Sequence, residues 1–253
     1  HKKTTKKSLK VHSVLSVVND SIPPSEGFRS IRPQYKYEGQ YHDRIEFWQN
    51  QSNRPIKEVN LEDLNPFASL SFPKIGFAHG CPIYDLSSVD FSELIGQLGK
   101  WKINRPTDRK DFLTHEDTIP SFAKGQLAVY DDAFMIDFTV ATFQLLLCNS
   151  RGDIIATLAH YIVFNKEGSI VGQFRNDLAG EMPMVTQDGK YVVVKYGGEY
   201  GADGGYHLQE GFRIFEVQTG DLTDDIPWNE SQPLRRFYYF PVHDYFVIIN
   251  SYR

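Results

Sequence analysis

Two cysteines are the residues of this chain best suited to covalent chemistry. In the segment HGCPIYD, His79 stands two residues before Cys81. A nucleophilic thiol needs a base within hydrogen-bonding distance. Residues this close along the chain rarely achieve that orientation, so the base would have to be another residue, such as His160 or His115. We expect Cys81 to be a small buried residue instead, and Cys148, which ends an apolar run, to belong to the core.

Imidazole and carboxylate side chains are neighbours at three further places, namely His42 and Asp43, His115 and Glu116, and His243 and Asp244. Metal sites need three or four ligands from converging elements. None of these pairs has the i, i+4 spacing of a zinc-binding helix or a second cluster at a recognised distance, and solvated turns explain them more simply. The sequence therefore predicts no metal and no cofactor. It also lacks phosphate-loop, dinucleotide, GxSxG and HExxH motifs, which favours a non-catalytic protein without deciding the question.

The candidate binding site is the glycine-rich stretch YGGEYGADGGYHLQEG at residues 196–211. A hairpin needs about two to five loop residues, and longer connections in compact domains tend to be functional or mobile. Glycines allow close backbone approach, while tyrosines and polar groups could contact a peptide, a sugar or calcium, although the carboxylates do not follow EF-hand order. The predicted partner-binding residues are Tyr196, Glu199, Tyr200, Asp203, Tyr206 and His207. A flexible tip that packs its tyrosines on a neighbouring loop is an equally weighted alternative.

Composition limits the classes of partner. The 253 residues carry a net charge of −5, which gives no global attraction for nucleic acid or anionic lipid. The one basic cluster, at residues 1–10, has no interleaved aromatic residues and is expected to be a flexible, solvated tail. No apolar run approaches the roughly 20 residues that span a bilayer. We therefore predict a soluble protein with no nucleic-acid partner and no membrane span.

The compartment stays open at this stage. Two cysteines do not make a disulfide framework, and the chain begins with His. Removal of a signal peptide would make the protein periplasmic or secreted.

The elements that must position the candidate site read as an all-β, mainly antiparallel protein with one or two short helices in the first half. Residues 1–253 are expected to form one domain, with an irregular mixed part at 11–125 and a regular meander of hairpins at 126–253. In the irregular part we expect a strand at 11–18, a hairpin turning near Gly39, a helical turn capped by Asn60 and a Ser-capped helix in SSVDFSELIGQLGKW. A β-sandwich and a decorated single sheet are the alternatives.

The meander is predicted to contain four successive strands, FMIDFTVATFQLLLCN, IIATL, YIVFN and IVGQF. A turn at SRGD joins the first strand to the second, and a turn at KEGS joins the third to the fourth. Further hairpins turn at QDGK and QTGD. The C-terminal RRFYYFPVHDYFVIINSYR reads as two strands around His243 and Asp244. Sequential strands joined by tight turns pair antiparallel.

The segments QDGKYVVV and GFRIFEVQTGDL together resemble one blade of a β-propeller of the broad WD40-like or YVTN-like kind, best over residues 182–222. In such blades a polar Asp-Gly turn precedes the second strand, and a Thr-Gly turn joins the third to the fourth. The Gly-His and Trp-Asp signature of WD40 repeats is absent. The resemblance implies a propeller-like meander of at most five or six blades of about 40 to 45 residues. It also implies an incomplete last blade, which we expect residues 11–18 to complete.

Two functions from different classes follow. The first is a non-catalytic, propeller-like protein that binds a partner protein or peptide through surface loops. The alternative is an extracytoplasmic carbohydrate-binding or carbohydrate-active protein, suggested by the many aromatic and acidic residues and by Trp48, Trp101 and Trp228 as stacking platforms. A Cys81 thiol enzyme is a third class, which requires an imidazole near the sulfur.

Overall fold

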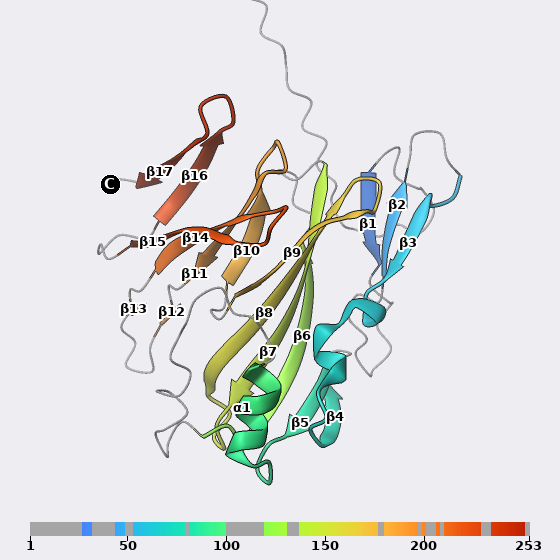
Figure 1. Cartoon of the computed structure of the whole chain (residues 1–253), viewed down its shortest axis with the longest axis vertical. Helices are drawn as coiled ribbons and strands as arrows, with labels where there is room; N and C mark the ends of the chain where they lie inside the picture. Colours follow the sequence, from blue (N-terminus) through green and yellow to red (C-terminus); the bar gives the residue numbers. More distant parts are fainter. Residues whose placement is uncertain are drawn as a thin grey trace, which may run out of the picture.

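The computed structural model describes residues 27–31, 44–48, 53–78, 81–99, 119–130, 137–176, 180–196, 199–200, 206–207, 210–228 and 234–250. Antiparallel strands dominate these segments, together with a single α-helix (Figure 1), which confirms the predicted all-β class. The predicted tail at 1–10 and strand at 11–18 lie outside the described residues. No helix in the described segments is long and apolar enough to cross a membrane.

The largest sheet is a six-stranded meander in which each strand pairs with the next along the chain. Its members are β4 (Lys74–Ala78), β5 (Cys81–Asp85), β6 (Phe122–Tyr130), β7 (Phe138–Cys148), β8 (Ile154–Asn165) and β9 (Ile170–Asn176). The regular meander thus includes β4 and β5, which come from the part of the sequence expected to be irregular.

Strand β8 corrects one sequence expectation. IIATL and YIVFN were predicted as separate strands, but they form one continuous strand of 12 residues. Ala159 and His160, which join the two runs, carry no turn signal, and both are buried within the sheet. Leu158 and Ile162 pack on one face of the sheet, whereas Tyr161 and Val163 pack on the other. The sequence was divided there because alanine and histidine are not strong strand formers, whereas burial on both faces of the sheet overrides that local preference.

The turn between β7 and β8 is built around Asn149. Its side-chain oxygen accepts hydrogen bonds from the backbone N–H of Arg151 at 3.0 Å and of Asp153 at 2.9 Å. Gly152 has a φ of 90°, a conformation that glycine adopts without a steric penalty. The RGD segment is therefore the polar tip of a hairpin, as predicted.

The blade-like segment falls in a four-stranded antiparallel sheet of order β10-β11-β14-β15. Its strands are β10 (Gly180–Val185), β11 (Tyr191–Tyr196), β14 (Glu210–Glu216) and β15 (Leu222–Trp228). A two-stranded ladder, β12 (Glu199–Tyr200) with β13 (Tyr206–His207), is inserted between β11 and β14. The chain then forms a C-terminal hairpin of β16 (Leu234–Phe240) and β17 (Tyr245–Asn250), which turns at residues 241–244 as predicted.

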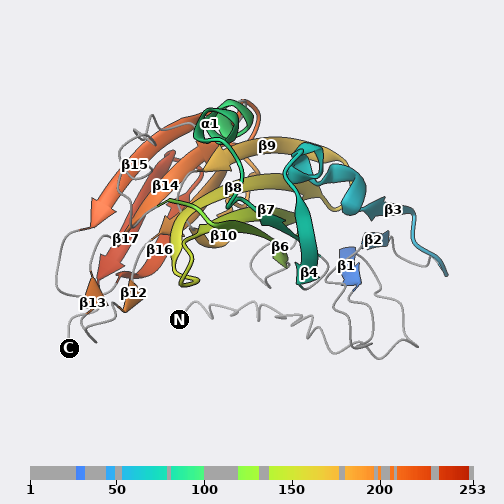
Figure 2. The ribbon, with the colours of Figure 1, turned by 90° about the horizontal axis from the view of Figure 1, so that it is seen from below.

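These sheets pack face to face. Val192 and Val194 of β11 contact the six-stranded sheet in one hydrophobic cluster, where Tyr161 stacks on Phe174. Val193, on the opposite face of β11, packs in a second cluster that Phe246 of the C-terminal hairpin also contacts. The three consecutive valines are therefore buried on two different sides. Figure 2 shows the orange and red strands of the four-stranded sheet and the hairpin gathered at one end of the molecule.

The other face of the six-stranded sheet is covered by the first half of the chain. This layer holds α1 (Phe91–Gly99), the short 3-10 helices η1 (Glu62–Leu64) and η2 (Pro66–Ser69), and a three-stranded sheet of β1 (Gly27–Ile31), β2 (Arg44–Trp48) and β3 (Lys57–Asn60). Leu94 and Leu98 of α1 join this hydrophobic cluster, and the helix lies across the sheet in Figure 1.

The helix caps differ in detail from the sequence expectations. Asn60 accepts a hydrogen bond from Glu62 N–H, but Leu61 is the N-cap residue of the first short helix and provides no side-chain cap. A second short helix follows and is capped by Asn65. Helix α1 is capped by Asp90, whose carboxylate accepts from Ser92 N–H at 2.8 Å, and not by a serine. A carboxylate at this position also complements the helix dipole.

Candidate functional site

The described part of the glycine-rich stretch between β11 and β14 is a two-stranded antiparallel ladder, which we call the glycine-rich hairpin. In the β12-β13 ladder, position 199 lies opposite 207, and position 200 lies opposite 206. The structure thus brings four predicted site residues, Glu199, Tyr200, Tyr206 and His207, together as two cross-strand pairs. Asp203 lies outside the described residues. The connection between β11 and β14 therefore contains a second, smaller ladder.

Tyr196, the remaining predicted site residue, lies at the base of this hairpin. Its side chain is only 8% exposed, and its hydroxyl donates a 2.8 Å hydrogen bond to Asp225 on β15. To reach Asp225 the ring crosses β14 over Gly211, where an added Cβ would lie 2.3 Å from the Tyr196 hydroxyl oxygen. Glycine at position 211 is required because the tyrosine ring occupies the space of a side chain.

Arg213 completes the base. Its side chain is 1% exposed, its Nε donates to Asp225 at 3.2 Å, and its guanidinium lies 5.4 Å from the Tyr196 ring centroid. Its Nη1 also donates to Asn176 at the end of β9, which belongs to the six-stranded sheet. We call Tyr196, Arg213, Asp225 and Asn176 the hairpin base. This buried polar network ties the two sheets together directly beside the glycine-rich hairpin.

Sequence reasoning did not identify Arg213, Asn176 or Asp225. Arg213 stands in FRIFEV with apolar neighbours on both sides, which is the only signal that its side chain could be buried. Its partners come from strands 37 and 12 residues away along the chain. Spacing within a motif cannot reveal contacts of this kind.

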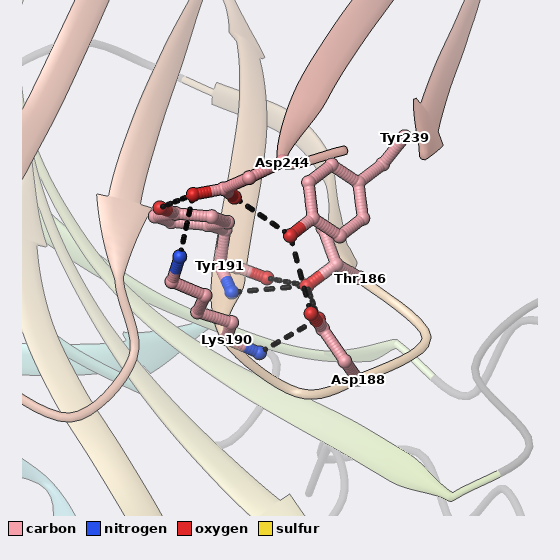
Figure 3. A network of polar contacts seen from close by, with 6 residues as sticks. All are labelled: Thr186, Asp188, Lys190, Tyr191, Tyr239 and Asp244. Atoms are coloured by element: carbon pink, nitrogen blue, oxygen red, sulfur yellow. Dashed lines mark hydrogen bonds and ion pairs between the residues drawn. The ribbon is translucent and has the colours of Figure 1, made fainter. Parts of the chain in front are cut away.

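A second polar network joins the QDGK turn to the turn of the C-terminal hairpin (Figure 3). The Tyr239 hydroxyl lies 3.1 Å from Asp188 Oδ2 and 2.9 Å from Asp244 Oδ1, and its single proton can be donated to one of them at a time. Lys190 donates to Asp244 at 2.7 Å. Thr186 donates to Asp188 at 2.7 Å and accepts from the Tyr191 backbone N–H at 3.0 Å. These contacts fix the QDGK turn and the turn of the C-terminal hairpin relative to each other.

Both carboxylates of this network are stabilised in their ionised form. The Lys190 hydrogen bond, with one from Tyr239, lowers the pKa of Asp244 below its ordinary value. Partial burial raises the pKa of Asp188, but hydrogen bonds from Thr186, the Lys190 backbone N–H and Tyr239 outweigh that effect and lower it overall. A glycosidase pair needs one protonated carboxylic acid at working pH. The geometry and charges of Asp188 and Asp244 are those of a structural clamp.

The side of the C-terminal hairpin that points away from the four-stranded sheet is aromatic and exposed. We call Tyr238, Phe240, Val242, His243 and Tyr245 the outer aromatic face. Phe240 and Tyr245 are 43% and 45% exposed, and their rings stack with centroids 5.0 Å apart. The His243 ring also stacks on Tyr245, with ring centroids 5.8 Å apart. Exposed apolar clusters of this kind mark interaction surfaces.

The cysteines are free thiols in the core, as expected. Burial, only partly opposed by the charge of Lys124, raises the pKa of Cys81 to about 11. The pKa of Cys148 is also raised, again chiefly by burial. A thiol with such a pKa is protonated at neutral pH, which argues against a thiolate nucleophile. His79 and His115, two possible bases, lie outside the described residues.

His160, the third candidate base, is buried on the face of the six-stranded sheet that the first half of the chain covers. Burial, reinforced by the charge of Arg175 and partly opposed by a hydrogen bond with Gln173, lowers the pKa of His160 to about 4. Its Nε2 lies 3.3 Å from Gln173 Oε1, and its Nδ1 has no hydrogen-bond partner among the described residues. At neutral pH His160 is an uncharged core residue.

The proposed carbohydrate platforms receive little support. Trp48 is buried, and its indole N–H donates to Glu46 at 3.2 Å. Trp101 and the side chain of Trp228 lie outside what the structure describes. Within the described segments, no group of three or more His, Cys, Asp or Glu residues could hold a metal ion.

Comparisons of the chain with protein-family models, with curated proteins and with solved structures found no match. The function is therefore argued from the residues and contacts above.

Proposed function

We propose that this is a non-catalytic, propeller-like protein that binds a partner protein or peptide through surface loops, with the glycine-rich hairpin as the contact. The four-stranded antiparallel sheet β10-β11-β14-β15, whose strands are ordered as in a propeller blade, supports the propeller-like arrangement. The raised pKa of the buried Cys81 thiol supports a non-catalytic role.

One observation carries the proposal, namely the hairpin base. Binding loops work best when a rigid scaffold positions them. Here the residue that leads into the hairpin, Tyr196, is fixed by Asp225 and Arg213, and Arg213 is in turn bonded to Asn176 of the next sheet. A buried network of this size gives the sheet a rigid edge where the glycine-rich connection begins, which supports a role of that connection in recognition.

Within this proposal, Tyr196 positions the hairpin, because its hydroxyl is already bonded and its ring is buried. The partner would be contacted by Glu199, Tyr200, Asp203, Tyr206 and His207. Glycan binding has less support, since Trp48 is buried and the carboxylates of Asp188 and Asp244 are both held ionised.

The test is selection from a phage-displayed library of random peptides on the immobilised full chain. Selected peptides are then measured against a variant that lacks residues 201–205. We expect peptide binding to be lost, because a chain without residues 201–205 can no longer pair Tyr200 with Tyr206 and the β12-β13 ladder is removed. The melting temperature should change little, because the deletion does not touch the hairpin base. A matched control replaces Arg151 by Ala at the other polar hairpin tip and should bind every selected peptide.

Equal peptide binding by the deletion variant would show that the glycine-rich hairpin is not the contact. Unfolding of the deletion variant would show that the hairpin is structural. A glycan array probed with the full chain provides the comparison with the carbohydrate alternative, and hairpin-dependent glycan binding in place of peptide binding would contradict the proposal.

A further inference from the structure

Strand β4 lies at one end of the six-stranded sheet and pairs only with β5 among the described residues. The Asp85 backbone N–H donates to the Pro73 carbonyl oxygen at 2.8 Å. Because consecutive residues of an antiparallel strand point their backbone groups to opposite sides, every second residue of β5 is directed at β4, and Gly76 and Ala78 lie opposite two of these residues. Phe77, between them, therefore turns its N–H and its C=O toward the free edge. An extended backbone is the ligand that such groups bind.

The side chains at this edge are apolar and exposed. Phe77 is 71% exposed and Ile75 is 63% exposed, and in the described segments only Val242 is a more exposed large apolar side chain. Ile75 is the extra residue of a β-bulge and has no opposite residue on β5. No atom lies within 4 Å of a Cβ added at Gly76, so the backbone between the two apolar side chains is open to close approach. Exposed apolar side chains beside a free strand edge are typical of a strand-addition site.

The other edges of the two larger sheets are protected against such pairing. The QTGD turn covers β9, because Gly220 of this turn lies against the carbonyl oxygen of Gln173. The edge strands β10 and β15 contain Pro183 and Pro227, and proline removes a backbone donor from an edge strand. Strand β4 has no proline within its five residues. Of these four edges, β4 therefore opposes pairing with another chain least.

Charge indicates the kind of strand that β4 can bind. Lys74 is the one charged residue of β4, and it forms no ion pair with any described residue. Its ammonium group lies 6.0 Å from the centroid of the Tyr84 ring, so the side chain is turned toward β5 and leaves the edge open. Residues 196–234 carry eight acidic side chains and one arginine, which leaves the rest of the chain with a net charge of +2.

Figure 1 places β4 on the other side of the molecule from β14 and β15, which belong to that acidic segment. A carboxylate on an incoming strand is therefore attracted to Lys74. The KIGFA sequence of β4 contains no acidic residue, so the same strand of a second copy cannot supply this carboxylate.

We propose that β4 is a strand-addition site, at which an extended segment of a partner protein pairs with the backbone of Phe77 and extends the six-stranded sheet by one strand. The segment carries apolar residues at alternate positions, which pack beside Ile75 and Phe77, and a carboxylate that pairs with Lys74. This site is separate from the glycine-rich hairpin and does not depend on the function proposed for that hairpin.

The test uses a phage-displayed library of short peptides, with Val, Ile, Phe or Tyr at every second position and Thr or Glu at the others, selected on the immobilised full chain. Binding of the selected peptides is measured by fluorescence anisotropy. We expect a family of peptides whose affinity falls at least about tenfold in Phe77→Asp, because the apolar contact beside the paired backbone is lost. Ile154→Asp is the matched control, since Ile154 is 59% exposed but lies on β8, which is paired on both sides. It should bind these peptides like the native chain.

Methylation of the peptide backbone tests strand pairing directly. Every second N–H of a paired strand faces its neighbour, so N-methylation of one alternate set of peptide residues should abolish binding, and methylation of the other set should be tolerated. Lys74→Glu is a second variant, which keeps both apolar side chains and should weaken the peptides that contain glutamate.

Circular dichroism and melting temperature establish that the variants fold, and Lys74→Glu decides the question if Phe77→Asp does not. A selection that yields no peptide sensitive to changes in β4 would overturn the proposal. So would an equal loss in Ile154→Asp, or tolerance of both methylation patterns. The variant lacking residues 201–205 should bind these peptides as the native chain does, which separates this result from the test of the glycine-rich hairpin.

Discussion

Tyr196 and Asp225 are joined by a 2.8 Å hydrogen bond although a whole strand, β14, lies between the strands that carry them. The tyrosine ring spans that strand over Gly211, and Arg213 packs beside it. This hydrogen bond connects β11 to β15, two strands that do not pair with each other, and so stabilises the sheet across three strands. This hydrogen bond lies at the end of β11, where the glycine-rich stretch begins. Its loss should therefore lower the stability of the fold and also affect the candidate site.

Gly211→Ala is expected to lower the free energy of unfolding by about 1 to 3 kcal/mol, the usual cost of overpacking a filled interior. The added methyl group would meet the Tyr196 ring and the Ile226 carbonyl oxygen, so the ring must leave Asp225 or the strand must shift. Urea denaturation measures the change. Gly76→Ala is the control, because no atom lies within 4 Å of an added Cβ there, and it should leave stability nearly unchanged. Equal effects of the two substitutions would contradict the packing argument.

Acid should loosen the attachment of the C-terminal hairpin. The pKa values of Asp188 and Asp244 are lowered in the folded state, so their stabilisation is present above the unfolded value of about 3.9 and is lost as pH falls below it. Hydrogen exchange of the β16 and β17 amides, initiated between pH 3 and pH 6 and normalised for intrinsic rates, should show this loss at the acid end of that range. In Asp244→Asn the hairpin should exchange faster at pH 6 and respond less to acid. A pH response identical to that of the native chain would rule out this clamp.

His160 should make stability depend on pH in a higher window. Its folded pKa of about 4 lies below the ordinary value of 6.5, so the stability it contributes is complete above pH 6.5 and falls as pH drops toward 4. The full loss would be about 3 kcal/mol, at about 1.36 kcal/mol for each pKa unit. The free energy of unfolding is measured in urea at intervals from pH 7 to pH 4.5. His160→Gln should remove most of the slope, and an unchanged slope would show that other groups cause it.

Cys81 should react slowly with alkylating reagents in the folded protein. With a pKa of about 11, roughly one thiol in 10⁴ is ionised at pH 7, compared with about 3% for an ordinary cysteine. Burial slows access further. Mass spectrometry of Cys81 labelled with iodoacetamide, native and in urea, should show labelling at least about a hundredfold faster after unfolding. Rapid labelling of the native chain would revive the hypothesis of a thiol enzyme.

Local sequence signals predicted the hairpins well because the turn residues carry their own conformational preference. QDGK, QTGD and the RGD tip all lie in turns with a glycine at positive φ, and runs rich in β-branched, aromatic and other apolar residues identified the strands around them. The same signals failed at β8, where Ala159 and His160 interrupt the apolar runs in the sequence although both are buried within one strand. They also failed at Asp90, because a carboxylate and a serine are equally good helix caps in sequence.

The candidate site was predicted only in part, for a different reason. The β12-β13 ladder brings Glu199, Tyr200, Tyr206 and His207 together because they are close along the chain. The hairpin base depends on Asn176, Arg213 and Asp225, which three different strands supply. The turn-to-turn network likewise joins residues more than 50 positions apart, such as Tyr239 and Asp188. Contacts of this kind follow from sheet packing and have no local signature.

The burial of β7 and β8 on both faces has a consequence for how the chain folds. When both faces of a strand pair are apolar, sliding one strand past the other exposes little additional apolar surface, so hydrophobic patterning alone specifies the alignment weakly. The turn supplies further information, because the Asn149 side chain accepts hydrogen bonds from the backbone N–H groups of Arg151 and Asp153 and so favours one loop conformation. Asn149 thus helps to set the register between β7 and β8. A change of register at this turn would shift all eleven paired positions of β7.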